Sequence, residues 1–367
     1  PLVSCSLPLS ERPADAVPFL RGLLPEGDAL AALAAEARVS VIDTFELLAR
    51  YGRDVAGALV IAEQAPDPAR FGLDPYDAHT LGDEVAGLER NPLGIHGDSE
   101  LSLAGLQNKL LLVRTADGWA RPRRGYPSTH ILKAEDRRHP GLARAEFECL
   151  TLAREVGLTP VESQLVELAG IPCLITERYD RVAAVAGPAD RLHQEDLCQA
   201  VGIDGAGNRG RAKYERRGGG GPGFRRAATL LESYAADAPR ELARLVSAIA
   251  FTIAIGNADA HAKNLSFLHD SPETIALAPL YDTVPTVLWP ALTKESALAV
   301  NGRFPIDELT LEDLCAEAAS WPFDRDAARA VATATLEQLR DAARALDSEA
   351  LGPVVAARCE ELLGGVA

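Results

Sequence analysis

The sequence lacks methionine entirely: none occurs among its 367 residues, not even at position 1, which is unusual for a chain of this length. It also lacks any apolar run approaching the roughly 18 residues of a membrane-spanning helix. Its first residues, Pro1-Leu-Val-Ser-Cys-Ser, contain no basic stretch followed by an apolar one. We therefore expect neither a signal peptide nor a membrane span.

Closely spaced cysteine pairs are missing as well. The six cysteines are scattered without a C-x-x-C pair, which argues against a disulfide framework and against a zinc site. Reduced, mostly buried thiols are typical of cytoplasmic proteins, so we predict a cytoplasmic location.

Positive charge is scarce: 37 Lys and Arg stand against 53 Asp and Glu, a formal net charge of −16. Such a chain does not attract nucleic acid through its overall field, so any DNA contact would need a local basic patch or a basic partner. With 47% hydrophobic and 25% charged residues, the chain has the composition of a globular, soluble protein with two or three domains.

Apolar periodicity divides the chain into a helical start, a strand-rich middle and a helical end. The start is predicted to hold helices at 16–24, 28–37 and 39–48, a strand at 57–62 and a linker at 63–100. The middle is predicted to form a βαββ lobe: a hairpin at 109–122, a strand at 129–133, a helix at 142–156 and strands at 161–168 and 171–177. The end is predicted to hold helices at 191–201, 227–234, 240–255, 306–320, 325–346 and 351–363, and a Gly- and Arg-rich loop at 205–223. The predicted fold class is α+β.

Residues 257–264 read Asn-Ala-Asp-Ala-His-Ala-Lys-Asn, directly after an apolar helix that ends in Gly256. Asp259 and Asn264 have the D-x-x-x-x-N spacing of a protein-kinase catalytic loop, and Asp282 follows where a kinase keeps its metal-binding Asp. Phosphoryl transfer needs a carboxylate to accept the proton of the attacking hydroxyl, and oxygen ligands for Mg²⁺. The alternative is a polar loop closed by Asx turns, with an unrelated Asp further along.

Two lysines precede this loop where a kinase would bind phosphates. Lys109 ends the segment Leu101–Lys109, whose backbone amides and lysine could cradle phosphate, although an ordinary turn has the same composition. Lys133 ends a predicted strand, like the strand lysine of kinases. Glu146 follows on the next helix, and we predict an ion pair between Lys133 and Glu146; the alternative is a solvated surface glutamate.

Leu174–Arg181 leaves the last strand of this lobe, where a kinase hinge binds adenine through backbone groups; the alternative is a simple strand exit. His261 and Lys263 lie within reach of Asp259, although an isolated histidine is more often structural. The order of these segments, each on the expected type of element, predicts a phosphotransferase.

The combined motifs resemble the HipA family, the kinase-fold toxins of bacterial HipBA toxin–antitoxin modules. The matching segments span almost the whole chain: Pro8–Ser10, Leu23–Glu26, Leu101–Lys109, Ser128–Lys133, Glu177–Arg181, Gln194–Gln199, the Gly-Gly-Pro-Gly loop, Ala258–Ser266 and Pro279–Asp282. The resemblance implies a two-lobed protein-kinase-like fold, with a mixed N-lobe and an all-helical C-lobe, after a small N-terminal subdomain. The implied boundaries are 1–90 for that subdomain, incomplete at its start, 91–185 for the N-lobe and 186–367 for the C-lobe.

The resemblance also assigns site residues. Asp259 is the implied catalytic base, Asn264 and Asp282 are the implied metal ligands, and Ser102 is the implied autophosphorylation site. The implied ATP-binding residues are Ala104, Gly105, Leu106, Gln107, Asn108, Lys109, Lys133, Glu177, Arg178, Tyr179, His261, Ala262, Lys263, Asn264 and Tyr281. A phosphoryl group on Ser102 would add up to two negative charges beside the ATP phosphates and repel the loop from its active position.

Members of the family are ATP- and Mg²⁺-dependent serine/threonine-protein kinases, so the resemblance implies ATP and Mg²⁺ as cofactors. It also implies a HipB-like helix-turn-helix antitoxin as partner and an aminoacyl-tRNA synthetase, glutamate-tRNA ligase, as substrate, whose modification yields dormant, persistent cells. Because the C-terminal half is acidic, we expect DNA contact only indirectly through the antitoxin. Two alternatives are a catalytically silenced kinase-fold module in a repressor complex and an aminoglycoside-type small-molecule kinase. The Ser102 loop and Gln194–Gln199 argue against the second.

Overall fold

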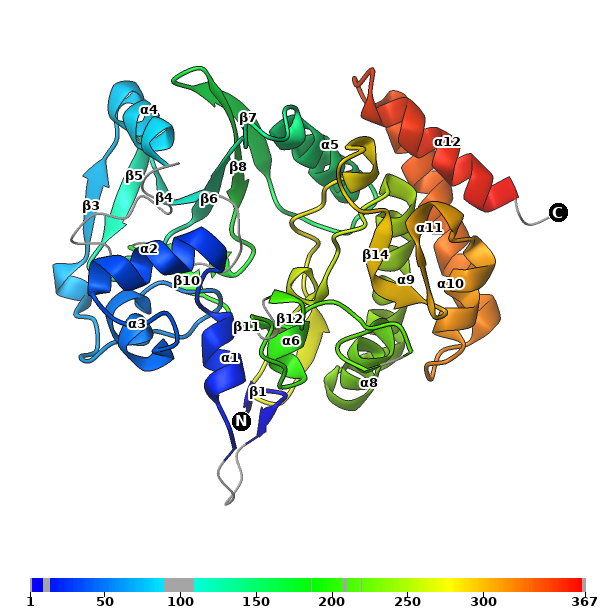
Figure 1. The fold of residues 1–367 in the computed structure, drawn as a ribbon, viewed down its shortest axis with the longest axis horizontal. Coiled ribbons are helices and arrows are strands. Elements are labelled where there is room, and N and C mark those ends of the chain that lie inside the picture. Colours follow the sequence, from blue (N-terminus) through cyan, green and yellow to red (C-terminus); the bar gives the residue numbers. More distant parts are fainter. Residues whose placement is uncertain are drawn as a thin grey trace. The chain divides into compact units, whose positions relative to one another are not determined.

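The computed structural model describes residues 2–8, 14–88, 109–185, 187–206, 210–218 and 220–364 (Figure 1). The chain divides into two compact units. The sheet unit comprises Asp15–Arg144 and Val161–Gln194, and the helical unit comprises Pro1–Ala14, Ala145–Pro160 and Glu195–Ala367. Each unit has a hydrophobic core of its own.

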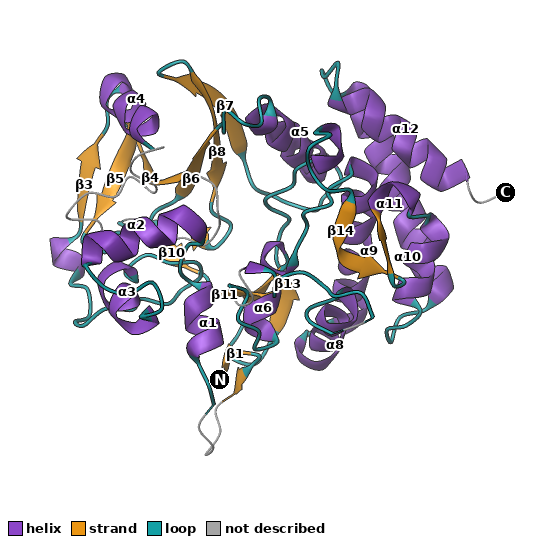
Figure 2. Ribbon diagram, viewed as in Figure 1, coloured by secondary structure: helices purple, strands orange, loops and turns teal. Residues whose placement is uncertain are grey.

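The sheet unit is built around one antiparallel sheet of six strands (Figure 2). In spatial order they are β3 (Gly72–Pro75), β5 (Gly118–Arg123), β4 (Lys109–Thr115), β6 (His130–Ala134), β8 (Ile171–Glu177) and β7 (Ser163–Leu168). The hairpin predicted at 109–122 is confirmed as β4–β5, and the strands predicted at 161–168 and 171–177 are confirmed as the paired strands β7 and β8. Gly118 suits the first turn because its φ of 136° is rarely adopted by residues with a side chain.

One helix, α4 (Ala78–Gly87), packs against this sheet through Leu81 and Val85. Since successive side chains of a strand point to opposite faces, the sheet residues beneath it alternate along the strands. They are Leu110, Leu112, Leu132, Cys173 and Ile175. The prediction of a linker at 63–100 is therefore wrong for β3 and α4. A capping box between Asp77 and Thr80 begins α4, a local signal that the weak apolar periodicity concealed.

The start of the sheet unit is helical, as predicted: α1 (Val17–Gly22), α2 (Gly27–Ala37) and α3 (Thr44–Tyr51). The last of these begins later than expected because the Asp43 side chain caps it, accepting from the Glu46 amide at 3.2 Å. The strand predicted at 57–62 is wrong. Gly57 has a φ of 82°, and its amide donates to Asp180 Oδ2 at 2.7 Å instead of to a neighbouring strand.

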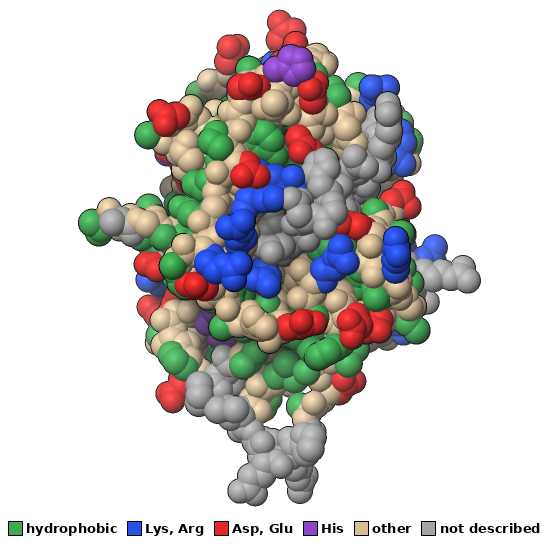
Figure 3. Space-filling model, turned by 90° about the vertical axis from the view of Figure 1, so that its left-hand side faces the viewer, with side chains coloured by type: hydrophobic (Ala, Val, Ile, Leu, Met, Phe, Trp, Pro, Cys, Tyr) green, Lys and Arg blue, Asp and Glu red, His purple; other side chains and the backbone are tan. Residues whose placement is uncertain are grey.

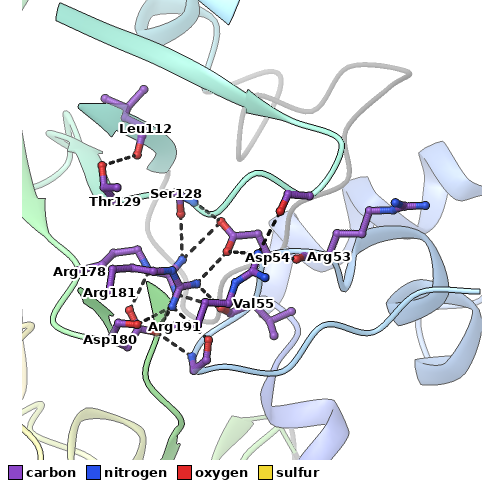
Figure 4. Close-up of polar contacts among 12 residues, drawn as sticks. Arg53, Asp54, Val55, Leu112, Ser128, Thr129, Arg178, Asp180, Arg181 and Arg191 are labelled. Atoms are coloured by element: carbon purple, nitrogen blue, oxygen red, sulfur yellow. Dashed lines mark hydrogen bonds and ion pairs between the residues drawn. The ribbon is translucent and has the colours of Figure 1, made fainter. Parts of the chain in front are cut away.

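A buried network of charges joins the chain after α3 to the chain after β8 (Figure 4). Asp54 is fully buried and accepts hydrogen bonds from Arg181 Nη2 at 2.8 Å and from the Ser128 amide at 2.9 Å. Arg178 donates to both carboxylate oxygens of Asp180, at 2.9 and 2.8 Å, in the bidentate geometry of a strong ion pair. These contacts fix the helical start of the sheet unit to its sheet.

One hydroxyl and one backbone carbonyl complete the network. Arg178 also donates to the Ser128 hydroxyl at 3.0 Å and to the Val55 carbonyl at 2.9 Å. Burial alone raises the pKa of Asp54 and of Asp180, but the guanidinium groups of Arg178 and Arg181 outweigh it. They lower the pKa of Asp54 and bring that of Asp180 to about 2.

Loss of one buried charge should therefore destabilise the sheet unit strongly. We expect Asp54→Ala to lower its free energy of opening by about 3–5 kcal/mol, because two arginines are left buried without their partner. Native-state hydrogen exchange at the amides of β6 and β8 measures this quantity. The matched control is Asp74→Ala: Asp74 lies 3.3 Å from Arg123 but is 63% exposed, so its loss should cost at most ~1 kcal/mol. Equal effects of the two substitutions would contradict a dominant role for the network.

The network also makes the stability of the sheet unit depend on pH. The pKa of Asp180 is about 2 in the folded chain, below the unfolded value of about 4. Its stabilising contribution, about 2 kcal/mol, is therefore complete above that unfolded value and is lost as the pH falls toward the folded one. Hydrogen exchange at several pH values should show a smaller loss of stability on acidification in Asp180→Asn than in the unaltered chain. Parallel pH profiles would refute this assignment.

The helical unit is organised around α9 (Ala238–Ile255), which packs against several other helices and is buried along most of its length. Among the described residues, the other α-helices of this unit are α5 (Leu142–Glu155, whose first residues belong to the sheet unit), α6 (Leu197–Ala200), α8 (Phe224–Tyr234), α10 (Leu311–Ala318), α11 (Arg325–Ala345) and α12 (Leu351–Gly364). Of the six helices predicted for the end of the chain, five are confirmed with shifted ends, and the helix at 191–201 is the exception. The predicted helix 306–320 begins only at Leu311, since Thr310 caps α10.

Short strands also occur among these helices, so the expectation of an all-helical C-lobe needs correction. They are β1 (Leu2–Ser4), β2 (Leu7–Pro8), β11 (Gln194–Asp196), β12 (Ser266–His269), β13 (Ile275–Leu277), β14 (Glu295–Val300) and β15 (Arg303–Pro305). The helix predicted at 191–201 is largely wrong, because β11 pairs with β12 and only α6 is helical. The sheet unit has one further pair, β9 (Arg181–Val182) with β10 (Asp190–Arg191).

The state of the cysteines and the character of the helices agree with the expectations from the sequence. All six cysteines are buried and none takes part in a disulfide, as predicted. Within the described ranges, no helix combines the length and apolar character needed to cross a bilayer.

Candidate functional site

The predicted catalytic loop follows the end of α9, and a glycine makes this exit possible. Gly256 has a φ of 71°, and the amides of Gly256 and Asn257 donate to Ile253 and Thr252 carbonyls at 3.2 and 3.0 Å. A Cβ at Gly256 would lie 2.3 Å from Val287 Cγ2. Any other residue here would displace the chain that carries Asp259.

The loop is closed by hydrogen bonds that leave one carboxylate in solvent. Asn257 Oδ1 accepts from the Asp259 amide at 3.1 Å, so an Asx turn is present as the alternative interpretation expected. The Asp259 carbonyl accepts from the His261 amide at 2.7 Å and from Asn264 Nδ2 at 3.3 Å. Asn257 and His261 are buried, whereas Asp259 is exposed. The side chain that would accept a proton is therefore held by a fixed backbone.

Hydrogen bonds from neighbouring segments also hold this loop on its buried side. The Ala258 amide donates to Thr286 Oγ1 at 2.8 Å, and the Ala297 amide of β14 donates to the Ala258 carbonyl at 2.8 Å. Both groups of Ala258 are thus paired inside the core, as buried backbone groups must be.

Tyr281 and Asp282 lie on the second predicted segment. Tyr281 donates to the Lys263 carbonyl at 2.7 Å, so its single proton is committed and Ser266 must donate to Tyr281 in their 2.6 Å contact. Asp282 has a φ of 53°, a conformation that Asp tolerates better than most residues and that is frequent at functional sites. Tyr281 therefore joins the Pro-Leu-Tyr-Asp segment to the predicted catalytic loop.

The predicted metal ligands are oxygen donors that suit Mg²⁺. Because Asn264 Nδ2 donates to the Asp259 carbonyl, its Oδ1 is the oxygen presented away from the loop. No group of three or more His, Cys, Asp or Glu side chains suited to a metal occurs in the described part of the chain. A pair of ligands fits Mg²⁺, which keeps several waters and takes further oxygens from phosphate.

In the sheet unit, Lys109 and Lys133 stand directly opposite each other on β4 and β6. The residues beside them, Leu110 and Leu132, face α4, so both lysines lie on the other face of the sheet. Lys109 is only 5% exposed. The structure thus places the two predicted phosphate-binding lysines side by side on one face of the sheet.

Three further predicted residues lie at the end of β8. Glu177 is half exposed and faces His130, whose pKa is lowered to about 4 by burial and by Arg114. The Tyr179 hydroxyl donates to Gln194. Arg178 has a structural role that the sequence analysis did not predict, since its guanidinium donates to Asp180, Ser128 and Val55. Only its backbone would remain for a nucleotide.

The candidate residues thus fall into two groups. The helical unit brings together Asp259, His261, Ala262, Lys263, Asn264, Tyr281 and Asp282, and the sheet unit carries Lys109, Lys133, Glu177, Arg178 and Tyr179. Ser102 and Ala104–Asn108 lie outside the described residues. Lys133 and Glu146 belong to different units, so their ion pair stays a prediction. Glu146 is only 2% exposed, however, so it is not a solvated surface glutamate.

Sequence reasoning missed residues that act over long separations. Tyr214, whose hydroxyl bonds Asp259, was read only as part of the Gly- and Arg-rich loop. Its one local signal was Lys213-Tyr-Glu215, a short run of larger side chains in a loop of glycines. The Asp54 network gave no local signal at all.

Basic side chains do gather locally in spite of the negative net charge. Figure 3 shows Lys and Arg side chains together on the face that lies to the left in Figure 1. In the sheet unit, Arg121 and Arg123 share one side of β5, and the Arg114 guanidinium lies 4.8 Å from the ring centre of Trp119. A local basic patch is what the sequence analysis required for any direct contact with a polyanion.

A kinase-like fold is confirmed by a solved relative. The structure of HipA from Shewanella oneidensis, described as the toxin–antitoxin complex of HipA, HipB and operator DNA, matches with a TM-score of 0.83 and 27% identity over 99% of this chain and 89% of that one. The chain also matches the HipA N-terminal domain at residues 1–62 and the HipA-like C-terminal domain at residues 101–345. It belongs to the HipA family.

Curated relatives agree. The protein named "Putative kinase Y4mE" from Sinorhizobium fredii is 37% identical over 320 residues, which are 84% of this chain and 74% of that protein. The serine/threonine-protein kinase toxin HipA of Shewanella oneidensis is 30% identical over 309 residues, 81% of this chain and 69% of that protein. The chain is thus similar to kinases over most of its length.

The exit from α9 gives a direct test of how the loop is held. We expect Gly256→Ala to destabilise the helical unit by about 1–3 kcal/mol, because alanine is strained at this φ and clashes with Val287. Urea unfolding measured at α9 by hydrogen exchange should show it. The control is Gly87→Ala in α4, where a Cβ meets nothing within 4 Å and alanine favours the helix. An unaffected Gly256→Ala protein would show that the loop tolerates a different exit.

Proposed function

We propose that this chain is an ATP- and Mg²⁺-dependent serine/threonine-protein kinase, the toxin of a HipA-type toxin–antitoxin module. The observation that carries the proposal is Asp259: an exposed carboxylate on a loop whose backbone is held by hydrogen bonds from and to the side chains of Asn257, Thr286 and Asn264. The Asx turn is closed by the Asn257 side chain, so the Asp259 carboxylate is not used in closing it. Family membership supports the same assignment.

In this reaction the acceptor hydroxyl oxygen forms a bond to the γ-phosphorus of ATP while the bond from that phosphorus to the bridging oxygen breaks and ADP leaves. The hydroxyl proton passes to a carboxylate oxygen of Asp259. Asn264 and Asp282 would hold Mg²⁺, which neutralises charge on the phosphates. His261, Ala262, Lys263 and Tyr281 would shape the nucleotide site through the contacts described above.

The sheet unit would contribute phosphate binding. We assign Lys109 and Lys133 to the ATP phosphates, together with the loop Ala104–Asn108, and Glu177, Arg178 and Tyr179 to the nucleotide through strand-exit groups. The ion pair of Lys133 with Glu146 would position that lysine. We also keep the division into 1–90, 91–185 and 186–367, with the family matches at 1–62 and 101–345 in its support.

The partners follow from the family rather than from the site. The similarity to HipA in a complex with HipB and DNA supports a HipB-like antitoxin as partner and DNA contact through it. We propose a translation factor as substrate, with glutamate-tRNA ligase as the first candidate, autophosphorylation at Ser102 and action in the cytoplasm. A silenced kinase-fold module is not favoured, because the groups for catalysis are all present.

The test is phosphoryl transfer from radiolabelled MgATP to the chain itself and to purified glutamate-tRNA ligase, with mass analysis of Ser102. Asp259→Asn should lower the rate by about 10²–10⁴-fold, the usual contribution of a positioned base. Asp282→Asn should lower it as well, whereas Asp270→Asn, an exposed acid after β12, should not. Failure of the unaltered chain to transfer phosphate, or unchanged transfer by Asp259→Asn, would overturn the proposal.

Ser102 needs its own variant. Ser102→Ala should abolish labelling of that residue while leaving transfer to other acceptors intact, since the serine is an acceptor and not part of the base. Persistence of the same self-labelling at that peptide would show that another hydroxyl is used.

A further inference from the structure

A tyrosine from the Gly- and Arg-rich loop reaches the catalytic loop within the helical unit. The Tyr214 hydroxyl donates a hydrogen bond to Asp259 Oδ1 at 2.9 Å. Its ring meets that of His261 edge to face, with centroids 5.5 Å apart and an interplanar angle of 88°. Tyr214 therefore contacts two side chains of the loop, Asp259 and His261.

The backbone on the N-terminal side of Tyr214 is fixed to the same loop. The Lys213 carbonyl accepts a hydrogen bond from the Ala262 amide at 3.1 Å. Lys213 itself is only 4% exposed, and its ammonium lies 5.8 Å from the centre of the Tyr214 ring. This side of the tyrosine cannot move without breaking the turn that holds His261 and Asn264.

The C-terminal side is fixed as firmly to β14. The Glu215 amide donates to the Ala297 carbonyl at 2.9 Å, and Glu215 Oε2 accepts from the Ala299 amide at 2.9 Å. The same Ala297 donates its amide to Ala258 in the catalytic loop. Lys213–Glu215 and the catalytic loop are thus two parts of one hydrogen-bonded structure.

The Asp259 carboxylate needs such a partner because its own torsion does not orient it. The last side-chain torsion of an aspartate is broad, and Asp259 is exposed, so no packing restricts its rotation. A donor fixed at Oδ1 selects one orientation and leaves Oδ2 to receive a proton.

We propose that Tyr214 is a positioning residue for Asp259: its hydroxyl holds Oδ1 so that Oδ2 faces the acceptor hydroxyl. The inference rests on the proposed kinase function. A competing arrangement, in which the phenol occupies the place of the acceptor and must leave before reaction, requires a mobile segment. The paired backbone on both sides of Tyr214 argues against that.

The experiment compares Tyr214→Phe with the unaltered full chain in ADP formation from MgATP alone, where water and the chain's own hydroxyls are the acceptors. We expect kcat to fall about tenfold, equivalent to ~1.4 kcal/mol, because the base loses its orientation. KM for ATP should change less than about twofold, since the hydroxyl is lost from the base and not from the nucleotide. The control Tyr51→Phe removes a phenol hydrogen bond to Leu33 in the sheet unit and should leave both constants unchanged.

A double-substitution cycle separates positioning from a merely structural role. In an Asp259→Asn background, Tyr214→Phe should reduce the residual rate by less than about twofold, because its effect passes through the carboxylate. An undiminished effect there, or full activity of Tyr214→Phe in the unaltered background, would overturn the inference. Higher activity of Tyr214→Phe would favour the blocking arrangement instead.

Folding and the parent proposal are controlled separately. If Tyr214→Phe lowers the unfolding midpoint, 3-fluorotyrosine at position 214 keeps both shape and hydroxyl and should retain the rate; loss of the rate there would contradict the inference. An inactive unaltered chain would refute the kinase function itself. An active unaltered chain with an equally active Tyr214→Phe variant would refute only the role of Tyr214.

Discussion

The sheet unit depends on the pairing of Asp54 with arginines at the end of β8. A carboxylate buried to this degree is tolerated only beside opposite charge and hydrogen-bond donors, and Arg181, Ser128 and Arg178 supply both. The same arginines form ion pairs with Asp180, which also accepts a hydrogen bond from the Gly57 amide. One polar cluster thus decides how the chain passes from the helices α1–α3 into the sheet. It also takes the Arg178 side chain away from any nucleotide.

The helical unit differs from the sheet unit in this respect, because its carboxylate of interest, Asp259, is exposed. The side chains of Asn257, Thr286 and Asn264 satisfy the backbone around the exposed Asp259. Gly256 permits the exit from α9, and Lys213–Glu215 adds a second layer. Because the backbone on both sides of Asp259 is already ordered, a carboxylate proposed as the base would lose little backbone entropy on binding an acceptor.

Features that depend on near neighbours in sequence could be predicted. The hairpins β4–β5 and β7–β8, the apolar helix α9 and the spacing of Asp259 and Asn264 are all of this kind. The failures had a common cause, which is competition from distant groups. In place of the strand expected at 57–62, the Gly57 amide donates a hydrogen bond to the Asp180 side chain. In place of the first part of the helix expected at 191–201, β11 pairs with β12. The contact of Tyr214 with Asp259 joins a glycine-rich loop to a helix exit, and no periodicity encodes such a pair.

The small number of sulfur atoms and their burial affect how the chain reacts with oxidants. With no methionine in the sequence and all six thiols buried, the chain offers peroxide almost no accessible sulfur. Burial also raises the pKa of Cys173 and Cys359 to about 12, which suppresses the thiolate that oxidants attack. In the folded chain, oxidation of sulfur is therefore limited by burial of the thiols and by their raised pKa.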